Sequence, residues 1–186
     1  MADKKYLKIA AGVLLAIILV IVAVMAQLRM RVDDQKIKKP KLAIHELVDS
    51  KERKYELKFE YDEDKILQSN KGNQYKGEEL NISFEEETLA KQRLENFEEL
   101  KARVRNHGMR QERESFEELK IDGKEAFRTL VNQAMRTYIK LNDEDYLKFV
   151  VFDNQNEELD NEKKQILLEK PEIKLVFKTL RISRKG

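Results

Sequence analysis

The two histidines come nearest to a known catalytic or metal-binding pattern in this sequence. His45 and Glu46 begin like the His-Glu-x-x-His motif, in which two histidines one helical turn apart bind zinc. The second histidine would stand at position 49, where the chain has Asp49, so the motif is absent. His107 precedes Gly108 at the predicted end of a helix, where an imidazole interacts favourably with the helix dipole. We therefore expect His107 to act as a helix-end residue and not as a ligand.

The acidic clusters also fall short of a defined site. The segment Asp153–Lys164 resembles a calcium loop in composition, but an EF-hand loop needs glycine at its sixth position and glutamate at its twelfth. Those positions hold Glu158 and Lys164, so a calcium site is excluded. The run Glu85–Glu87 offers paired carboxylates, which a chain with 39% charged residues supplies by composition alone. The triplet 81–83 (Asn-Ile-Ser) fits the glycosylation pattern but lies within a predicted strand, so we discount it.

The inventory of reactive residues is poor. The chain has no cysteine, which excludes disulfides, thiolate zinc sites, cysteine nucleophiles and a lipid-modified N-terminal cysteine. It also has no glycine-rich phosphate loop and no serine nucleophile elbow. We therefore expect a protein that is not an enzyme, with no catalytic, metal-binding or cofactor-binding residues and no cofactor. The sequence names no binding residues and no oligomeric state.

Charge is distributed evenly once the N-terminal part is set aside. The whole chain has a net charge of +2, and residues 1–28 account for it through three lysines and one aspartate. The rest of the chain is therefore neutral overall. A neutral domain has no broad positive field to attract nucleic acid, so no nucleic-acid partner is expected.

One segment near the start of the chain is much more hydrophobic than the rest. Residues 9–28 read IAAGVLLAIILVIVAVMAQL and contain no charge. A helix of about 20 apolar residues spans the ~30 Å hydrocarbon layer and satisfies its own backbone hydrogen bonds. Tyr6 stands at one edge of the segment, and Arg29 and Arg31 follow the other. We expect a basic tail at residues 1–8, an uncleaved transmembrane signal-anchor helix at 9–28 and a juxtamembrane linker at 29–41.

Two alternatives concern this anchor. Val24–Ala26 could serve as a signal-peptidase site, which would make the protein secreted, although the apolar run is longer than a usual signal core. Six basic residues follow the segment closely and three precede it, which favours a cytoplasmic C-terminal domain by the positive-inside count. Long domains cross membranes largely regardless of charge, so the residues alone leave both orientations open.

The remaining residues, 42–186, are predicted to form one α+β domain. Residues 42–48 could be a helical turn or an edge strand. Alternation of apolar and polar residues predicts strands at 55–61 and 80–84, with a loop between them. The apolar spacing then becomes helical from Leu89 to Val104, with Thr88 as the expected cap, Gln92 near the reciprocal capping position and Gly108 as a left-handed stop.

The second half predicts a meander followed by a helix. Strand-like runs at 115–121 and 124–134 flank Asp122-Gly123, the strongest short hairpin signal. Runs at 136–141 and 146–152 flank a second polar turn, which gives about four antiparallel strands. Pro171 then opens a C-terminal amphipathic helix through residue 182, whose stripe packs on the sheet. The stripe residues are Ile173, Val176, Phe177 and Leu180.

Three passages resemble PsbP-like domains. Residues 55–64 (YELKFEYDED) resemble their aromatic opening strand, 116–130 (FEELKIDGKEAFRTL) their central hairpin, and 171–182 (PEIKLVFKTLRI) their closing helix. The resemblance covers about residues 53–183, although the proline and tryptophan usual after the first strand are missing. It implies an α/β/α sandwich, an antiparallel sheet flanked by helices, with a non-enzymatic binding or assembly role. It also favours a position outside the cytoplasmic membrane.

These observations combine into one expectation. The chain is expected to be a single-pass, membrane-anchored binding module, with its PsbP-like domain (residues 42–186) on the extracytoplasmic side. Its partners are the lipid bilayer, through the N-terminal helix, and a protein at the membrane. The alternatives are a cytoplasm-facing accessory subunit of a membrane complex, or a secreted protein if the leader is cleaved.

Overall fold

A computed structural model describes residues 40–69, 71–155 and 159–185 of the chain. The predicted tail, the predicted membrane helix and the linker up to residue 39 lie outside these described residues. Within the described residues, no helix is both long enough and apolar enough to cross a membrane.

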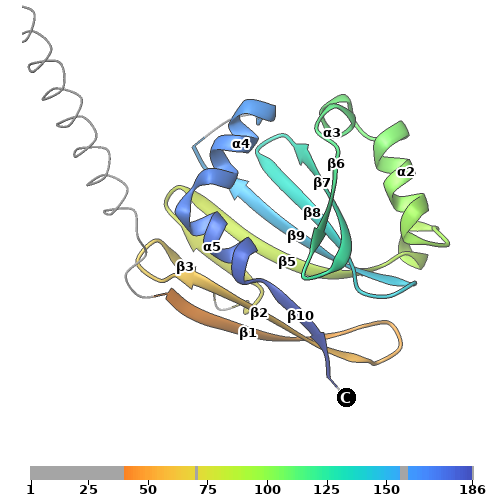
Figure 1. Cartoon of the computed structure of the whole chain (residues 1–186), viewed down its shortest axis with the longest axis horizontal. Coiled ribbons are helices and arrows are strands. Elements are labelled where there is room, and N and C mark those ends of the chain that lie inside the picture. Colours follow the sequence, from red (N-terminus) through yellow and green to blue (C-terminus); the bar gives the residue numbers. More distant parts are fainter. Residues whose placement is uncertain (1–39, 70, 156–158, 186) are drawn as a thin grey trace, which may run out of the picture. The chain divides into compact units, whose positions relative to one another are not determined.

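The described residues form an α+β structure with two antiparallel sheets, which confirms the predicted class (Figure 1). The small sheet has the strand order β1-β2-β10, and the large sheet has the order β3-β4-β5-β9-β8-β7-β6. The small sheet consists of β1 (Pro40–Val48), β2 (Lys54–Asp62) and β10 (Arg181–Arg184). The large sheet consists of β3 (Ile66–Gln68), β4 (Gln74–Gly77), β5 (Leu80–Thr88), β6 (Glu117–Ile121), β7 (Lys124–Val131), β8 (Ala134–Lys140) and β9 (Asp145–Asp153).

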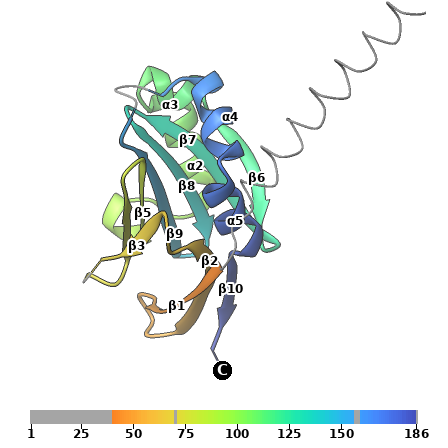
Figure 2. The same ribbon diagram turned by 90° about the vertical axis from the view of Figure 1, so that its left-hand side faces the viewer.

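Helices cover both faces of the large sheet (Figures 1 and 2). One face, the outer face, is covered by α2 (Phe97–His107) and α3 (Arg110–Glu114). The opposite, inner face packs against the small sheet, α4 (Asn161–Glu169) and α5 (Pro171–Thr179). A 3-10 turn, η1 (Ala90–Gln92), precedes α2.

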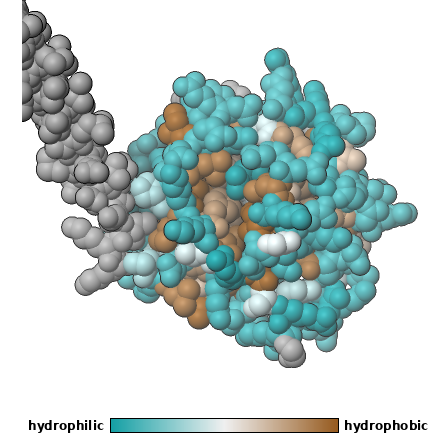
Figure 3. Space-filling view, in the orientation of Figure 1, coloured by the Kyte–Doolittle hydropathy of each residue, from teal (hydrophilic) through white to brown (hydrophobic). Residues whose placement is uncertain are grey.

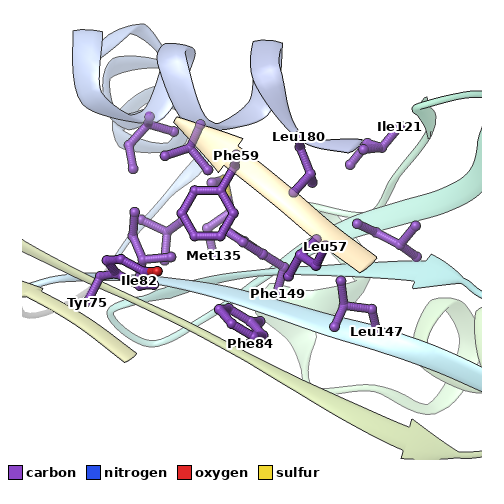
Figure 4. Packing of buried hydrophobic residues seen from close by; sticks show 14 of the residues in the cluster. Leu57, Phe59, Tyr75, Ile82, Phe84, Ile121, Met135, Leu147, Phe149 and Leu180 are labelled. Atoms are coloured by element: carbon purple, nitrogen blue, oxygen red, sulfur yellow. The ribbon is translucent and has the colours of Figure 1, made fainter. Parts of the chain in front are cut away.

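The main core lies between the two sheets and beneath α5 (Figure 4). Strand β2 shows how the sequence builds it, because Tyr55, Leu57, Phe59 and Tyr61 are all buried while the residues between them are not. Successive side chains of a strand point to opposite faces, so this alternation puts four large side chains on one face. A second, smaller cluster joins α2 to the outer face through Phe97, Leu100, Val104, Phe127, Tyr138 and Tyr146.

The predicted meander is confirmed as β6 to β9, whose neighbours pair antiparallel. The Asp122-Gly123 hairpin is also confirmed. Ile121 pairs with Lys124, and both turn residues have a positive φ, 51° and 74°, as a two-residue type I′ turn requires.

The predicted helix from Leu89 is wrong over its first part. After η1 the chain turns through Arg93, whose φ of 56° is left-handed and interrupts a helix. The α-helix begins only at Phe97, because the side chain of Asn96 accepts a hydrogen bond from Glu99 N at 2.9 Å and caps it. Thr88 instead accepts a bond from Lys91 N in the 3-10 turn. The helix ends at His107 as predicted, but Gly108 is extended and not left-handed.

Other elements decide a predicted alternative or differ from the prediction. Residues 42–48 form the edge strand, one of the two predicted alternatives, but that strand already begins at Pro40, within the predicted linker. The loop predicted between β2 and β5 contains the short hairpin β3–β4. Helix α5 ends at Thr179, because Leu180 is extended and the chain continues as β10 on the free edge of β2. Helices α3 and α4 were not predicted, since both lie in highly polar segments.

Candidate functional site

The outward face of β1 carries three exposed aliphatic side chains. Leu42, Ile44 and Val48 are 55%, 54% and 49% exposed, whereas Ala43 and Leu47 between them are buried. We call these three exposed residues the β1 stripe. An exposed aliphatic row on a strand is unusual in a chain this rich in charge. Removing such apolar surface from water is favourable, so an exposed row indicates a contact surface.

The backbone of β1 is open along the same strand. Asp49 N donates to Arg53 O at 3.0 Å, so Asp49 directs its backbone groups toward the β2 side of the hairpin. Because this direction alternates along an antiparallel strand, the odd-numbered residues of β1 bond to β2 and the even-numbered residues point their backbone groups away from it. Among these, Val48 N donates to Glu86 Oε2 at 2.9 Å. The N–H groups of Leu42, Ile44 and Glu46 have no partner among the described residues. Such an edge can accept another strand.

The charges next to the β1 stripe are largely matched. Glu46, which stands within it, pairs with Lys54 at 3.2 Å and Lys185 at 2.8 Å. The hydrogen bonds from these two lysines hold the pKa of Glu46 below its usual range. Lys41 at the start of the strand pairs with Glu63 at 2.5 Å. The stripe is therefore an apolar surface with a neutralised charge in it.

The inward face of β1 is fixed by His45. Its Nε2 lies 2.6 Å from the hydroxyl of Tyr75 on β4, and its ring centroid lies 4.6 Å from that of Phe84 on β5. Burial lowers the pKa of His45 and raises that of Tyr75, so both groups are neutral near pH 7. The histidine singled out in the sequence thus joins the two sheets.

Asp49, which replaces the second histidine of the zinc motif, organises the end of the β1–β2 hairpin. It accepts hydrogen bonds from Arg53 Nε at 2.6 Å, from two backbone N–H groups, and from Asn142 at 3.0 Å. Burial opposes its ionisation, but the bonds from Arg53 and the backbone outweigh burial and keep its pKa low. Ser50 donates to Asp145 at 2.9 Å in the same place. These contacts fix the hairpin to the β8–β9 turn.

Several ionisable side chains that could take part in acid–base chemistry line a cleft between α2 and the outer face. This cleft, the α2 cleft, has a volume of about 290 Å³. Glu87 on β5 accepts hydrogen bonds from Tyr146 at 2.6 Å and from Lys148. Burial opposes its ionisation, but those bonds hold its pKa below the usual range, and burial raises the pKa of Tyr146. His107 also lines the α2 cleft, at the end of α2.

The α2 cleft brings residues together without leaving an activated group. The carboxylate of Glu87 is committed to a lysine and a tyrosine, and Arg136 lies 4.0 Å from Glu112. A general base needs a pKa near the operating pH, and Glu87 is shifted away from it. No group of three or more histidine, cysteine or acidic side chains is placed to hold a metal ion within the described part of the chain.

The other residues noted in the sequence separate in space. The run Glu85–Glu87 divides across β5, so that Glu87 faces the α2 cleft while Glu86 faces the small sheet. Asn81 donates to Asn154 at 2.9 Å across the strand pair. Lys164 lies in α4 and donates to Glu117, and Glu158 lies outside the described residues.

The β1 stripe was missed by the sequence reasoning. The run Leu42–Val48 has apolar residues on both faces of the strand, so alternation does not tell which face is buried. Only the pairing of His45 and Leu47 with the core assigns Leu42, Ile44 and Val48 to solvent.

No protein-family model, no curated protein and no solved structure matches this chain.

Proposed function

We propose that the protein is a membrane-tethered, non-enzymatic binding module whose contact surface is the β1 stripe and the free edge of β1. The observation that carries the proposal is the coincidence, on one strand, of exposed Leu42, Ile44 and Val48 with N–H groups at positions 42, 44 and 46 that have no partner among the described residues. An extended segment of a partner protein that adds to this edge would gain main-chain hydrogen bonds and cover the aliphatic side chains.

The position of β1 in the chain supports a partner at the membrane. In this proposal residues 9–28 form the bilayer-spanning anchor and the folded domain lies on the extracytoplasmic side. Eleven residues separate the anchor from Pro40, and an extended chain rises at most about 3.5 Å per residue. The start of β1 therefore lies within ~40 Å of the bilayer surface, and tethering raises its effective concentration toward partners there.

A PsbP-like relationship is part of this proposal. It is supported by the central β6–β7 hairpin and by the α5 segment, which carry two of the three resembling passages. A non-enzymatic role is further supported by the α2 cleft, where the acidic and basic groups named above are matched with one another.

Copurification with a matched pair of variants tests the contact surface. Ile44→Lys places a charge in the β1 stripe, whereas Ile44→Val keeps an aliphatic side chain at the same position. After extraction of membranes with a mild detergent, we expect the partner recovered with the wild type to remain with Ile44→Val and to be lost with Ile44→Lys. Equal recovery with both variants, each with an unchanged melting temperature, would contradict a contact at β1.

The side of the membrane is tested separately. Protease added to intact cells should degrade the domain if it lies outside. Survival of the domain would favour the cytoplasm-facing accessory subunit that the six basic residues after the apolar segment suggest.

A further inference from the structure

A buried arginine lies on the inner face of the large sheet. Arg128 on β7 pairs across the sheet with Glu117 on β6 and with Thr137 on β8, and Thr137 pairs with Phe149 on β9. Residues directly opposite in an antiparallel pair share a face, so these side chains form one row. The row ends at Glu117 on an edge strand.

Arg128 is held by few contacts. Its side chain is only 6% exposed. Its Nε donates to the hydroxyl of Thr137 at 3.1 Å, and its guanidinium carbon lies 4.7 Å from the ring centre of Phe177 on α5. Burial lowers the pKa of Arg128, although its guanidinium remains charged near neutral pH. The side chain is therefore oriented by a hydroxyl and an aromatic face.

The terminal nitrogens of Arg128 have no hydrogen-bond or ion-pair partner in the part of the chain that the structure describes. No hydrogen bond from them and no carboxylate within ion-pair distance is found among the described residues, yet neither nitrogen is fully sealed from solvent. Unpaired buried charge is costly, so proteins normally pair it. The two donors of one edge of the guanidinium are thus available to a ligand.

The other buried cations behave differently. Lys101 reaches Glu98, Glu118 and Glu125 at 2.5 to 3.3 Å. Lys164 reaches Glu117 at 3.3 Å, so the acidic residue directly across from Arg128 is already committed to another cation. Of the buried Lys and Arg side chains in the described residues, Arg128 is the one without a carboxylate partner.

The surroundings select the kind of anion. Two parallel N–H groups of a guanidinium match the two oxygens of a carboxylate. The neighbouring rings of Phe177 and Phe149, 5.4 Å apart, favour an apolar body on the ligand. Glu117 contributes a nearby negative charge, which repels a phosphate dianion more than a carboxylate monoanion. Figure 3, in the orientation of Figure 1, shows apolar surface in the middle of the domain, surrounded by hydrophilic side chains. Figure 1 draws the strands between α4–α5 and β6 in the same region.

We propose that Arg128 anchors a binding site for the carboxylate of a small apolar organic acid, between β7 and α5. Thr137 and Phe177 orient the guanidinium, and its two terminal nitrogens donate to the carboxylate. This site lies on the inner face of the large sheet and is independent of the β1 stripe.

Thermal unfolding of the full-length chain in a neutral detergent tests the site with hexanoate, acetate and inorganic phosphate as probes. A ligand that binds only the folded state raises the melting temperature. We expect hexanoate to bind with a Kd of about 0.1 to 1 mM, given its few non-hydrogen atoms. Acetate should bind at least about tenfold more weakly, and phosphate should produce no shift.

Variants separate binding from a structural role. Arg128→Met should abolish the response to hexanoate, Arg128→Lys should weaken it, and Arg136→Met, on the other face of the sheet, should leave it intact. Without ligand, Arg128→Met should melt no lower than the wild type, because it removes an unpaired buried charge. A lower melting temperature of this variant would assign Arg128 a structural role and overturn the proposal.

A second readout does not depend on how the variants fold. In the wild-type protein labelled with 15N-arginine, hexanoate should shift the Nε–Hε resonance of Arg128 more than any other arginine side-chain resonance. Absence of that shift, or an equal response to hexanoate in Arg128→Met, would overturn the proposal. A larger response to phosphate than to hexanoate would contradict the carboxylate assignment.

Discussion

Two carboxylates near the end of the β1–β2 hairpin, that of buried Asp49 and that of half-buried Glu86, have opposite electrostatic environments. Asp49 accepts hydrogen bonds from Arg53 and the backbone, and its pKa is lowered. Glu86 accepts one bond, from Val48 N, while its Oε1 is buried without a partner. Burial and the charges of Asp49 and Asp145 raise the pKa of Glu86. The same hairpin end therefore contains one carboxylate that stabilises the fold and one that weakens it.

Replacing Glu86 should stabilise the protein at neutral pH. A raised pKa in the folded state means that stability is lost as the pH rises through that pKa. Glu86→Gln cannot ionise, so we expect its melting temperature at pH 7 to exceed that of the wild type by about 2 to 4 °C. The difference should shrink as the pH falls through the raised pKa. Calorimetry across this pH range measures the effect, and a lower melting temperature for Glu86→Gln at pH 7 would contradict it.

Replacing Asp49 should have the opposite effect. Its lowered pKa means that its contribution is present above the unfolded-state pKa and is lost as the pH falls through the folded-state pKa. Asp49→Asn should reduce the free energy of unfolding at pH 7 by about 2 to 3 kcal/mol, because Arg53 loses the nearer of its two charged partners, Asp49 and Asp145. Urea denaturation at pH 7 and at acidic pH measures the difference, which should diminish in acid. An equal loss at both pH values would argue against an ionised Asp49.

At the scale of elements, the start of α2 is set by its capping residue and not by the spacing of apolar residues. The apolar period continues back to Leu89, but Arg93 is left-handed and Asn96 provides the cap. Asn96→Ala should reduce the free energy of unfolding by about 1 kcal/mol. Thr88→Ala serves as the matched control, because Thr88 bonds only the 3-10 turn at 3.3 Å. If urea denaturation showed a larger loss for Thr88→Ala, the observed start of α2 would be contradicted.

Local patterns predicted those elements whose chemistry is local. The strict alternation of residues 55–61 predicted β2, and Asp122-Gly123 predicted the β6–β7 turn. Strand β10 could not be predicted in this way, because Arg181–Arg184 is mostly polar and becomes a strand only by pairing with β2, more than a hundred residues earlier. Helices α3 and α4 could not be predicted from hydrophobic periodicity, because neither has a clear apolar stripe in its sequence.

The candidate sites show the same limit. Leu42, Ile44 and Val48 were visible as apolar residues, but their exposure depends on which face His45 and Leu47 turn toward β4 and β5. Arg128 looks like any other arginine in the sequence. Its position within a buried strand segment, FRTLV, was the available signal. Only the structure shows that, among the described residues, no carboxylate lies within ion-pair distance of Arg128, because Glu117 directly across from it pairs with Lys164.

At the scale of the whole molecule, the chain has an apolar segment near its start and a domain whose strand β1 lies at the edge of a sheet. The leader at residues 9–28 contains no charge, whereas the domain is neutral overall and covered with paired charges. In the proposed function, residues 9–28 anchor the domain at the membrane surface, where even a modest edge contact gains from high effective concentration. Membrane attachment and use of the β1 edge are therefore expected to occur together.

Site-specific photo-crosslinking in intact cells tests this combination most directly. A photoreactive residue at position 44, within the β1 stripe, is compared with one at position 110, an exposed residue of α3 on the outer face of the large sheet. After an alkaline wash of the membranes, we predict that the chain stays in the membrane pellet and that one discrete adduct forms from position 44 and not from position 110. Recovery of the chain in the wash with its leader intact, or equal adducts from both positions, would contradict the account.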